Sequence, residues 1–279
     1  MPAPQASMMQ QLARAKFMSN ALKVPKDWSQ PSGDNGHYNK AFQPSEMAAA
    51  PGAPPLFIPA SVNKYHVDTQ KMLNEKVGNF IDGICSAICS AWSQRLPLAS
   101  MAGIVVNSVT ATGGQVVGPP LGPLILASAP KESPQLLLYS NAVVNTMNTT
   151  WLSFQSMIKI PGLPLFPMFA AFPSPVAPPT PSPVPAPLAA LAPAASSLFV
   201  ASSLSSQMLG MFGNPTANYA REIFDAVATG IQASFTTWYA STMFTKIMGT
   251  GPVPSFAPPY VPVGPVVGGT GMMTPGSIV

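Results

Sequence analysis

The residues that could do chemistry are few and lie far apart in the sequence. The chain of 279 residues has two histidines, His37 and His66, and two cysteines, Cys85 and Cys89. Neither histidine lies near a cysteine or a paired carboxylate in sequence, so acid–base and metal chemistry lack their usual partners. No G-x-S-x-G, P-loop, dinucleotide-binding, HExxH or EF-hand pattern occurs in the sequence. We therefore expect a protein that is not an enzyme, with no catalytic, cofactor-binding or metal-binding residues and no small-molecule substrate.

The two cysteines lie four residues apart in the stretch FIDGICSAICSAW, residues 80–92. On a helix they share one face, and a disulfide between successive helical turns is geometrically unfavourable. Two further ligands at the spacing of a zinc site are absent from the sequence. The pattern predicts two small, buried thiols.

Charged residues are scarce and unevenly distributed. They make up 8% of the chain, against about 25% in typical soluble domains. Of the 13 basic and 9 acidic residues, fourteen lie in residues 1–82. A free monomer keeps itself soluble with a surface of mixed charges, and residues 83–279 are too poor in charge to form one. The basic residues near the N-terminus are spaced out and accompanied by acids, so no nucleic-acid partner is expected.

Three arrangements could explain a charge-poor surface: insertion in a membrane, disorder, or cover by other protein. Disorder goes with low hydrophobicity, whereas this chain is 47% hydrophobic. The most apolar stretches, 97–129 and 160–205, are interrupted by Pro, Gly, Ser and Thr, so no clean transmembrane helix is predicted. Residues 1–26 lack the apolar core of a secretory signal. Cover by other protein subunits is the leading interpretation, with membrane association as the alternative.

One unusual sequence motif occurs twice, as TTWLSFQSMIKIPGLPLFPMFA at 149–170 and TTWYASTMFTKIMGTGPVPSFA at 236–257. A more divergent third copy, at residues 90–111, lacks the lysine and the phenylalanine. The copies are unequally spaced, which argues against a regular solenoid and favours a closed, pseudo-threefold arrangement. Alignment without gaps gives the predicted structural anchors of the repeat: Trp92, Trp151, Trp238, Gly103, Gly162, Gly249, Pro119, Pro178, Pro265, Phe169, Phe256, Lys159 and Lys246.

Each copy reads as a helix followed by a proline-rich arm. Apolar residues recur at helical spacing up to each tryptophan. Ser133 and Pro134 predict a helix start, and Gly162 and Gly249 predict helix ends. The arms GGQVVGPPLGPL, FPSPVAPPTPSPVPAPL and FAPPYVPVGPVVGG favour extended polyproline II conformation and not central strands.

The expected fold is mainly α, with three divergent helix-plus-arm repeats, long irregular extended segments and an irregular N-terminal tail. The tail includes one short amphipathic helix with Met9, Leu12, Phe17 and Leu22 near one face. The expected division is an N-terminal arm at 1–60 and repeats at 61–123, 130–193 and 194–279.

These features favour a structural subunit of a large multi-protein assembly, such as a phage tail, baseplate or virion, or a contractile-injection-like particle. The expected location is accordingly a virion or assembled particle. The first alternative is a membrane-associated or cell-envelope protein. The second is a proline-rich scaffold that binds adaptor domains, for example through PTPSP at 179–183.

Overall fold

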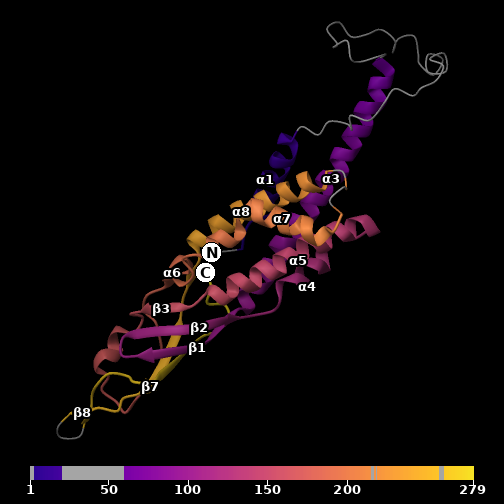
Figure 1. Ribbon diagram of the computed structural model, residues 1–279. Coiled ribbons are helices and arrows are strands. Elements are labelled where there is room, and N and C mark those ends of the chain that lie inside the picture. Colours follow the sequence, from indigo (N-terminus) through magenta and orange to yellow (C-terminus); the bar gives the residue numbers. More distant parts are fainter. Residues whose placement is uncertain (1–2, 21–59, 215–216, 218, 258–260) are drawn as a thin grey trace. The chain divides into compact units, whose positions relative to one another are not determined.

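The computed structural model describes residues 3–20, 60–214, 217, 219–257 and 261–279. The chain divides into two compact units, one formed by Met1–Phe17 and Ile81–Val279 and the other by Met18–Phe80. The first unit contains a group of helices and a group of strands (Figure 1). The α-helices of the described chain are α1 (Ala6–Ser19), α3 (Ala60–Arg95), α4 (Leu121–Ser128), α5 (Pro134–Met157), α6 (Leu188–Leu191), α7 (Ala201–Phe212) and α8 (Ala220–Ser241), and the 3-10 helices are η1 (Leu96–Leu98), η2 (Pro167–Ala171) and η3 (Ala195–Phe199).

Six strands form one antiparallel sheet in the order β3-β2-β1-β10-β7-β4, and two short strand pairs, β5–β6 and β8–β9, lie apart from it. The strands are β1 (Ser100–Asn107), β2 (Thr110–Val117), β3 (Ile160–Leu163), β4 (Val176–Pro181), β5 (Ala186–Pro187), β6 (Met243–Phe244), β7 (Ile247–Pro252), β8 (Phe256–Ala257), β9 (Val261–Pro262) and β10 (Gly269–Met273).

The prediction of a mainly α fold is wrong. In the described part of the chain 56% of residues are helical and 21% lie in strands, so the protein is mixed α/β. Parts of the expected irregular arms are strands, and the positions of the prolines help to explain which parts. β2 and β10 contain no proline, because the prolines of their arms fall outside these strands. β4 carries three prolines and lies at the sheet edge, where a missing N–H need not remove a ladder hydrogen bond.

The strand order links the three helix-and-strand segments in a cycle. α3 is followed by β1 and β2, α5 by β3 and β4, and α8 by β7 and β10. In each case the first strand pairs with the second strand of another segment: β1 with β10, β3 with β2, and β7 with β4. The two sheet edges, β3 and β4, come from the same segment. The segments of α3 and α8 therefore each contribute two adjacent strands to the sheet, and the segment of α5 contributes both edge strands.

The start of α5 follows the sequence prediction. Ser133 is its N-cap, and its Oγ accepts a hydrogen bond from the Leu136 backbone N–H at 3.2 Å, with Pro134 in the first turn. The predicted helix ends at Gly162 and Gly249 are wrong, because α5 ends at Met157 and α8 at Ser241. Both glycines, like Gly103, lie in the strand that follows the helix. The residues after each helix continue as strand because they pair with another segment, an interaction that periodicity alone does not reveal.

The N-terminal helix is confirmed as α1, but its buried face differs in part from the expected one. Met9, Ala13 and Phe17 are buried, whereas Leu12 is partly exposed. Leu22 lies outside the described residues. Ala13 lies at the centre of this buried face, and its small side chain allows α1 to approach its neighbours closely.

Candidate functional site

The three tryptophans predicted as anchors meet in the core of the first unit. The ring centroids of Trp92 and Trp151 are 5.0 Å apart, those of Trp92 and Trp238 are 5.0 Å apart, and those of Trp151 and Trp238 are 5.9 Å apart. Each ring comes from a different long helix, α3, α5 or α8. All three side chains are buried, so the cluster ties the three helices together.

The cluster is dense with aromatic rings. Trp92 meets both other tryptophans edge to face, a geometry that sets the positive edge of one ring against the negative face of another. Phe154 and Phe235 pack beside the tryptophans, and Phe235 stacks on Phe199 with centroids 3.7 Å apart. The three indole N–H groups have no hydrogen-bond acceptor among the described residues. Each unpaired donor lowers the stability of the fold by about 1–3 kcal/mol. The packing of the aromatic rings must therefore contribute more stability than these donors cost.

Arg95, at the end of α3, places a buried cation beside this cluster. Its guanidinium carbon lies 4.9 Å from the centroid of the Trp151 ring, a cation–π geometry. Its Nε donates to the Pro119 carbonyl at 2.9 Å and its Nη2 donates to Gln155 Oε1 at 2.7 Å. Burial lowers the pKa of Arg95 to about 10, so the side chain stays charged at neutral pH. Arg95 thereby joins the helix end to the segment after β2.

Sequence reasoning did not single out Arg95 as a site residue. A signal was present, since Arg95 is the one charged residue between residues 83 and 130. Arginine is almost never fully buried unless it is paired, so an arginine in so long an uncharged run is a candidate for a specific contact.

The predicted glycine anchors divide into two kinds. Gly103 and Gly162 have positive φ angles of 74° and 95°, which glycine adopts without strain, and each lies at a register shift of its strand. Gly249 instead faces a ring: a Cβ built on it would lie 2.6 Å from Phe166 Cζ. Phe166 is fully buried and stacks on Phe169 with centroids 5.0 Å apart. Gly249 is thus required for space.

We expect Gly249→Ala to lower the free energy of unfolding by about 1–3 kcal/mol, the usual cost of overpacking a core. Gly210 is the matched control, because it lies within α7 and nothing is within 4 Å of its built Cβ. Gly210→Ala should raise stability by up to about 1 kcal/mol through helix propensity. Urea unfolding of both variants tests this, and a Gly249→Ala protein as stable as the parent would contradict the packing argument.

The other predicted anchors do not converge on one place. Pro178 lies exposed in β4, where its carbonyl accepts from Thr180 Oγ1. Phe169 is buried, Pro265 is half-buried, and the side chain of Phe256 lies outside the described residues. Lys159 and Lys246 are exposed. They lie just ahead of β3 and β7, so their expected place at helix C-termini is wrong.

Cys85 and Cys89 are both buried in α3 with free thiols, which confirms their expected burial. Burial raises the pKa of the Cys85 thiol, and the same effect raises the pKa of Cys89 to about 12. Since the thiolate is the reactive form, the structure gives these cysteines no nucleophilic role. Within the described residues no group of His, Cys, Asp and Glu could hold a metal ion. His37 and the side chain of His66 lie outside them.

We expect both thiols to resist alkylation in the native protein at pH 8 and to react rapidly once urea unfolds it. The folded pKa values exceed the unfolded value of about 8.5, so the folded chain holds these protons more tightly. That contribution to stability is complete below pH 8.5 and is lost as the pH rises toward 12. Labelling time courses followed by mass spectrometry test the first point, and rapid labelling without denaturant would contradict it.

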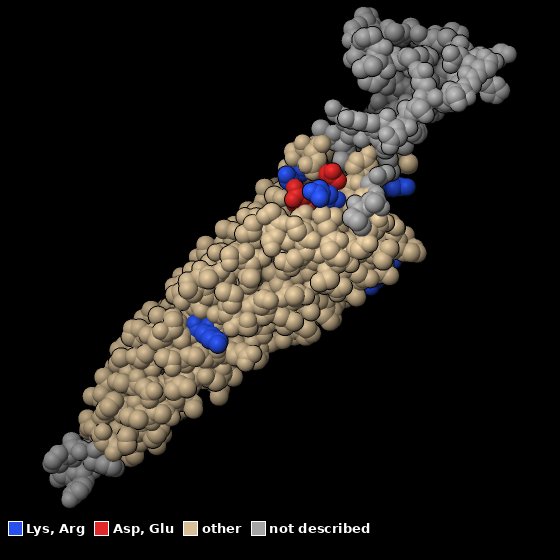
Figure 2. Space-filling view, in the orientation of Figure 1, with Lys and Arg blue, Asp and Glu red and all other residues tan. Residues whose placement is uncertain are grey.

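The surface formed by the strands carries almost no charge. In the face shown by Figure 2, charged side chains gather near one end of the helices and a broad remaining area has a single basic patch. Residues 96–130, 133–220 and 226–279 together contain two charged residues, Lys159 and Lys246. Large apolar side chains are exposed on the same strands, among them Val105 at 44%, Val117 at 44% and Met272 at 59%. We call the outward-facing side chains of β1, β2 and β10 the neutral sheet face: Ala102, Val105, Asn107, Thr112, Gln115, Val117, Thr270 and Met272.

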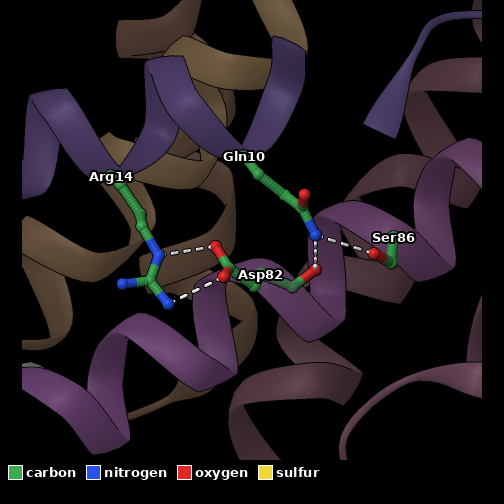
Figure 3. A network of polar contacts seen from close by, with 4 residues as sticks. All are labelled: Gln10, Arg14, Asp82 and Ser86. Carbon is green, nitrogen blue, oxygen red and sulfur yellow. Dashed lines mark hydrogen bonds and ion pairs between the residues drawn. The ribbon is translucent and has the colours of Figure 1, made fainter. Parts of the chain in front are cut away.

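Four of the eleven charged residues of the first unit form ion pairs where α1 meets α3 and α8. Figure 3 shows Arg14 of α1 facing the carboxylate of Asp82 of α3, with Nε and Nη2 each 2.7 Å from a carboxylate oxygen. One turn earlier, Gln10 Nε2 donates to the Asp82 carbonyl at 3.1 Å and to Ser86 Oγ at 2.9 Å. Lys16 Nζ lies 3.3 Å from Asp225 of α8. Sequence reasoning missed this contact because its partners are far apart in the chain.

Comparison with known proteins gives no relative. No family model, no curated protein and no solved structure matches the chain. None of the described helices combines the length and apolar character that crossing a membrane requires.

Proposed function

We propose that this protein is a non-enzymatic structural subunit of a large multi-protein assembly, and that neighbouring subunits cover the neutral sheet face. The observation that carries the proposal is the exposure of Val105, Val117 and Met272 on strands that have no charged residue. Burial of apolar area contributes about 25 cal/mol per Å². Cover by other protein would remove this area from water without burying an unpaired charge.

The composition of the face fits a protein partner. Its exposed apolar residues are interspersed with uncharged polar side chains such as Thr112, Gln115 and Thr270. Depletion of charge at the centre, with hydrogen-bonding groups among apolar ones, is the anatomy of protein–protein interfaces. A virion, phage tail, baseplate or contractile-injection-like particle is the kind of assembly proposed, because such particles are built from subunits with no catalytic role.

A scaffold function for the proline-rich arm is less well supported than the proposed one. The PTPSP stretch overlaps β4, which pairs with β7. Just after β4, the Ser182 backbone N–H donates to the Ile247 carbonyl at 2.9 Å. An adaptor domain would have to compete with these contacts for the same residues.

The size of the native species that contains this chain tests the proposal. Material from the native source, separated by size without denaturant and detected with an antibody, should migrate far above the 29.0 kDa of one chain. Cross-linking from a photoreactive residue at Val105 should capture other protein chains, whereas the same probe at exposed Arg221 should capture less. A native species of one chain, with no cross-links from Val105, would contradict the proposal. Carbonate-resistant recovery in membranes would favour the envelope alternative.

A further inference from the structure

α1 contacts the rest of its unit in the manner of one protein bound to another. Its centre is apolar, because Met9, Ala13 and Phe17 are at most 2% exposed. Gly230 of α8 lets the helices approach, since a Cβ built there would lie 2.8 Å from the Met9 carbonyl oxygen. Around that centre lie the polar contacts of Gln10 and Arg14 (Figure 3) and the ion pair of Lys16 with Asp225. An apolar centre with a polar rim is typical of a protein–protein interface.

Ion pairs also occur in this contact. The pairs Arg14–Asp82 and Lys16–Asp225 each join α1 to a long helix. Their side chains are between 33% and 44% exposed, so screening by water leaves each a small contribution to stability. Charges in such positions fix register and select the partner more than they add affinity.

α1 differs from the other short helices in its connection. α4 joins α5 through residues 129–133, and α7 joins α8 through residues 213–219. Between the end of α1 at Ser19 and the start of α3 at Ala60 the chain has residues 20–59. At about 3.3 Å per residue, this stretch permits a separation of up to roughly 130 Å. The covalent connection therefore does not require α1 to bind its own chain.

We propose that the groove between α3 and α8, lined by Asp82, Ser86, Cys89, Asp225 and Gly230, receives α1 of a second copy of this chain. Adjacent copies then exchange their N-terminal helices. The inference rests on the proposed function, since an assembly is what holds copies side by side. An α1 helix of the same chain and an α1 helix of a neighbouring copy make the same contacts. The one with the higher effective concentration therefore occupies the groove. A dilute chain binds its own α1, and crowded copies exchange.

A mixing experiment with two full-length charge variants tests the exchange. R14D sets two carboxylates against each other in its own groove, and D82R sets two guanidinium groups against each other. Reciprocal exchange between the two variants restores opposite charges in both grooves. Native mass spectrometry of the equimolar mixture should show heterodimers in several-fold excess over the statistical proportion, which higher salt should reduce. Statistical proportions, or monomers alone, would overturn the proposal.

A cysteine pair gives a second test that does not depend on the charges. Cys89 Sγ lies 3.9 Å from Met9 Sδ, so positions 9 and 89 face each other, and the M9C thiol in a C85S background can be joined to Cys89 by oxidation or by a short bifunctional thiol reagent. Oxidation should give intrachain links in dilute protein and interchain links that increase with concentration and dominate in native particles. L12C, on the more exposed side of α1, is the control and should link poorly. Intrachain links alone in large native particles would refute exchange while leaving the proposed function intact.

Discussion

Replacing Trp92 by alanine should lower the free energy of unfolding by about 3–5 kcal/mol. Trp92 is fully buried and contacts both Trp151 and Trp238 edge to face. The variant leaves a cavity where aromatic rings of α3, α5 and α8 meet. That loss is a large share of the total stability of about 5–15 kcal/mol that is typical of a domain. Urea unfolding followed by far-UV circular dichroism measures it.

Leu152 provides the matched control for the tryptophan prediction. It is next to Trp151 in α5 but is 52% exposed, so Leu152→Ala should change stability by less than about 0.5 kcal/mol. Near-UV circular dichroism should lose intensity in the Trp92 variant and stay unchanged in the Leu152 variant. A Trp92→Ala protein that unfolds at the same urea concentration as the parent would show that the cluster does not hold the helices together.

Replacing Met272 by glutamate should reduce incorporation of the chain into its native assembly by more than about tenfold. A charge buried without a partner costs several kcal/mol, and each 1.4 kcal/mol is a factor of ten in binding. Met272 is 59% exposed in the single chain, so the thermal midpoint of the purified variant should stay close to that of the parent. Co-purification of tagged variants with the native particle measures incorporation.

Two further variants separate an effect of charge from an effect of position. Met272→Leu keeps the side chain apolar and should assemble normally. Arg221→Glu changes the charge at an exposed position of α8 near the other charged residues, and it should also assemble. Normal incorporation of Met272→Glu would mean that no neighbour covers this part of the neutral sheet face.

The helices could be predicted from the sequence more completely than the strands. Helical periodicity and the Ser133–Pro134 start identify α5, because a helix is held by contacts within a few residues. The sheet depends on pairing between distant segments, such as β1 with β10. Glycines also interrupt strands of this sheet, such as GTGMM in β10, so they break the β-branched alternation that indicates a strand.

The candidate site was predictable only in part. Equal spacing from each tryptophan to a glycine identifies Gly103, Gly162 and Gly249 as equivalent positions. The spacing does not show that all three lie in strands or that the three rings meet. The contacts of α1 with Asp82 and Asp225 join residues that are far apart in sequence. No local pattern encodes such a contact, so these residues emerged from the structure alone.

Oxidation of the methionines by dilute peroxide tests the cover of the neutral sheet face most directly. Met272 is exposed at 59%, whereas Met101 and Met147 are buried and serve as internal references. In native particles Met272 should oxidise many times more slowly than in the purified chain, while the references stay slow in both. Equal oxidation of Met272 in the two samples would show that this surface faces water and would contradict the proposed function.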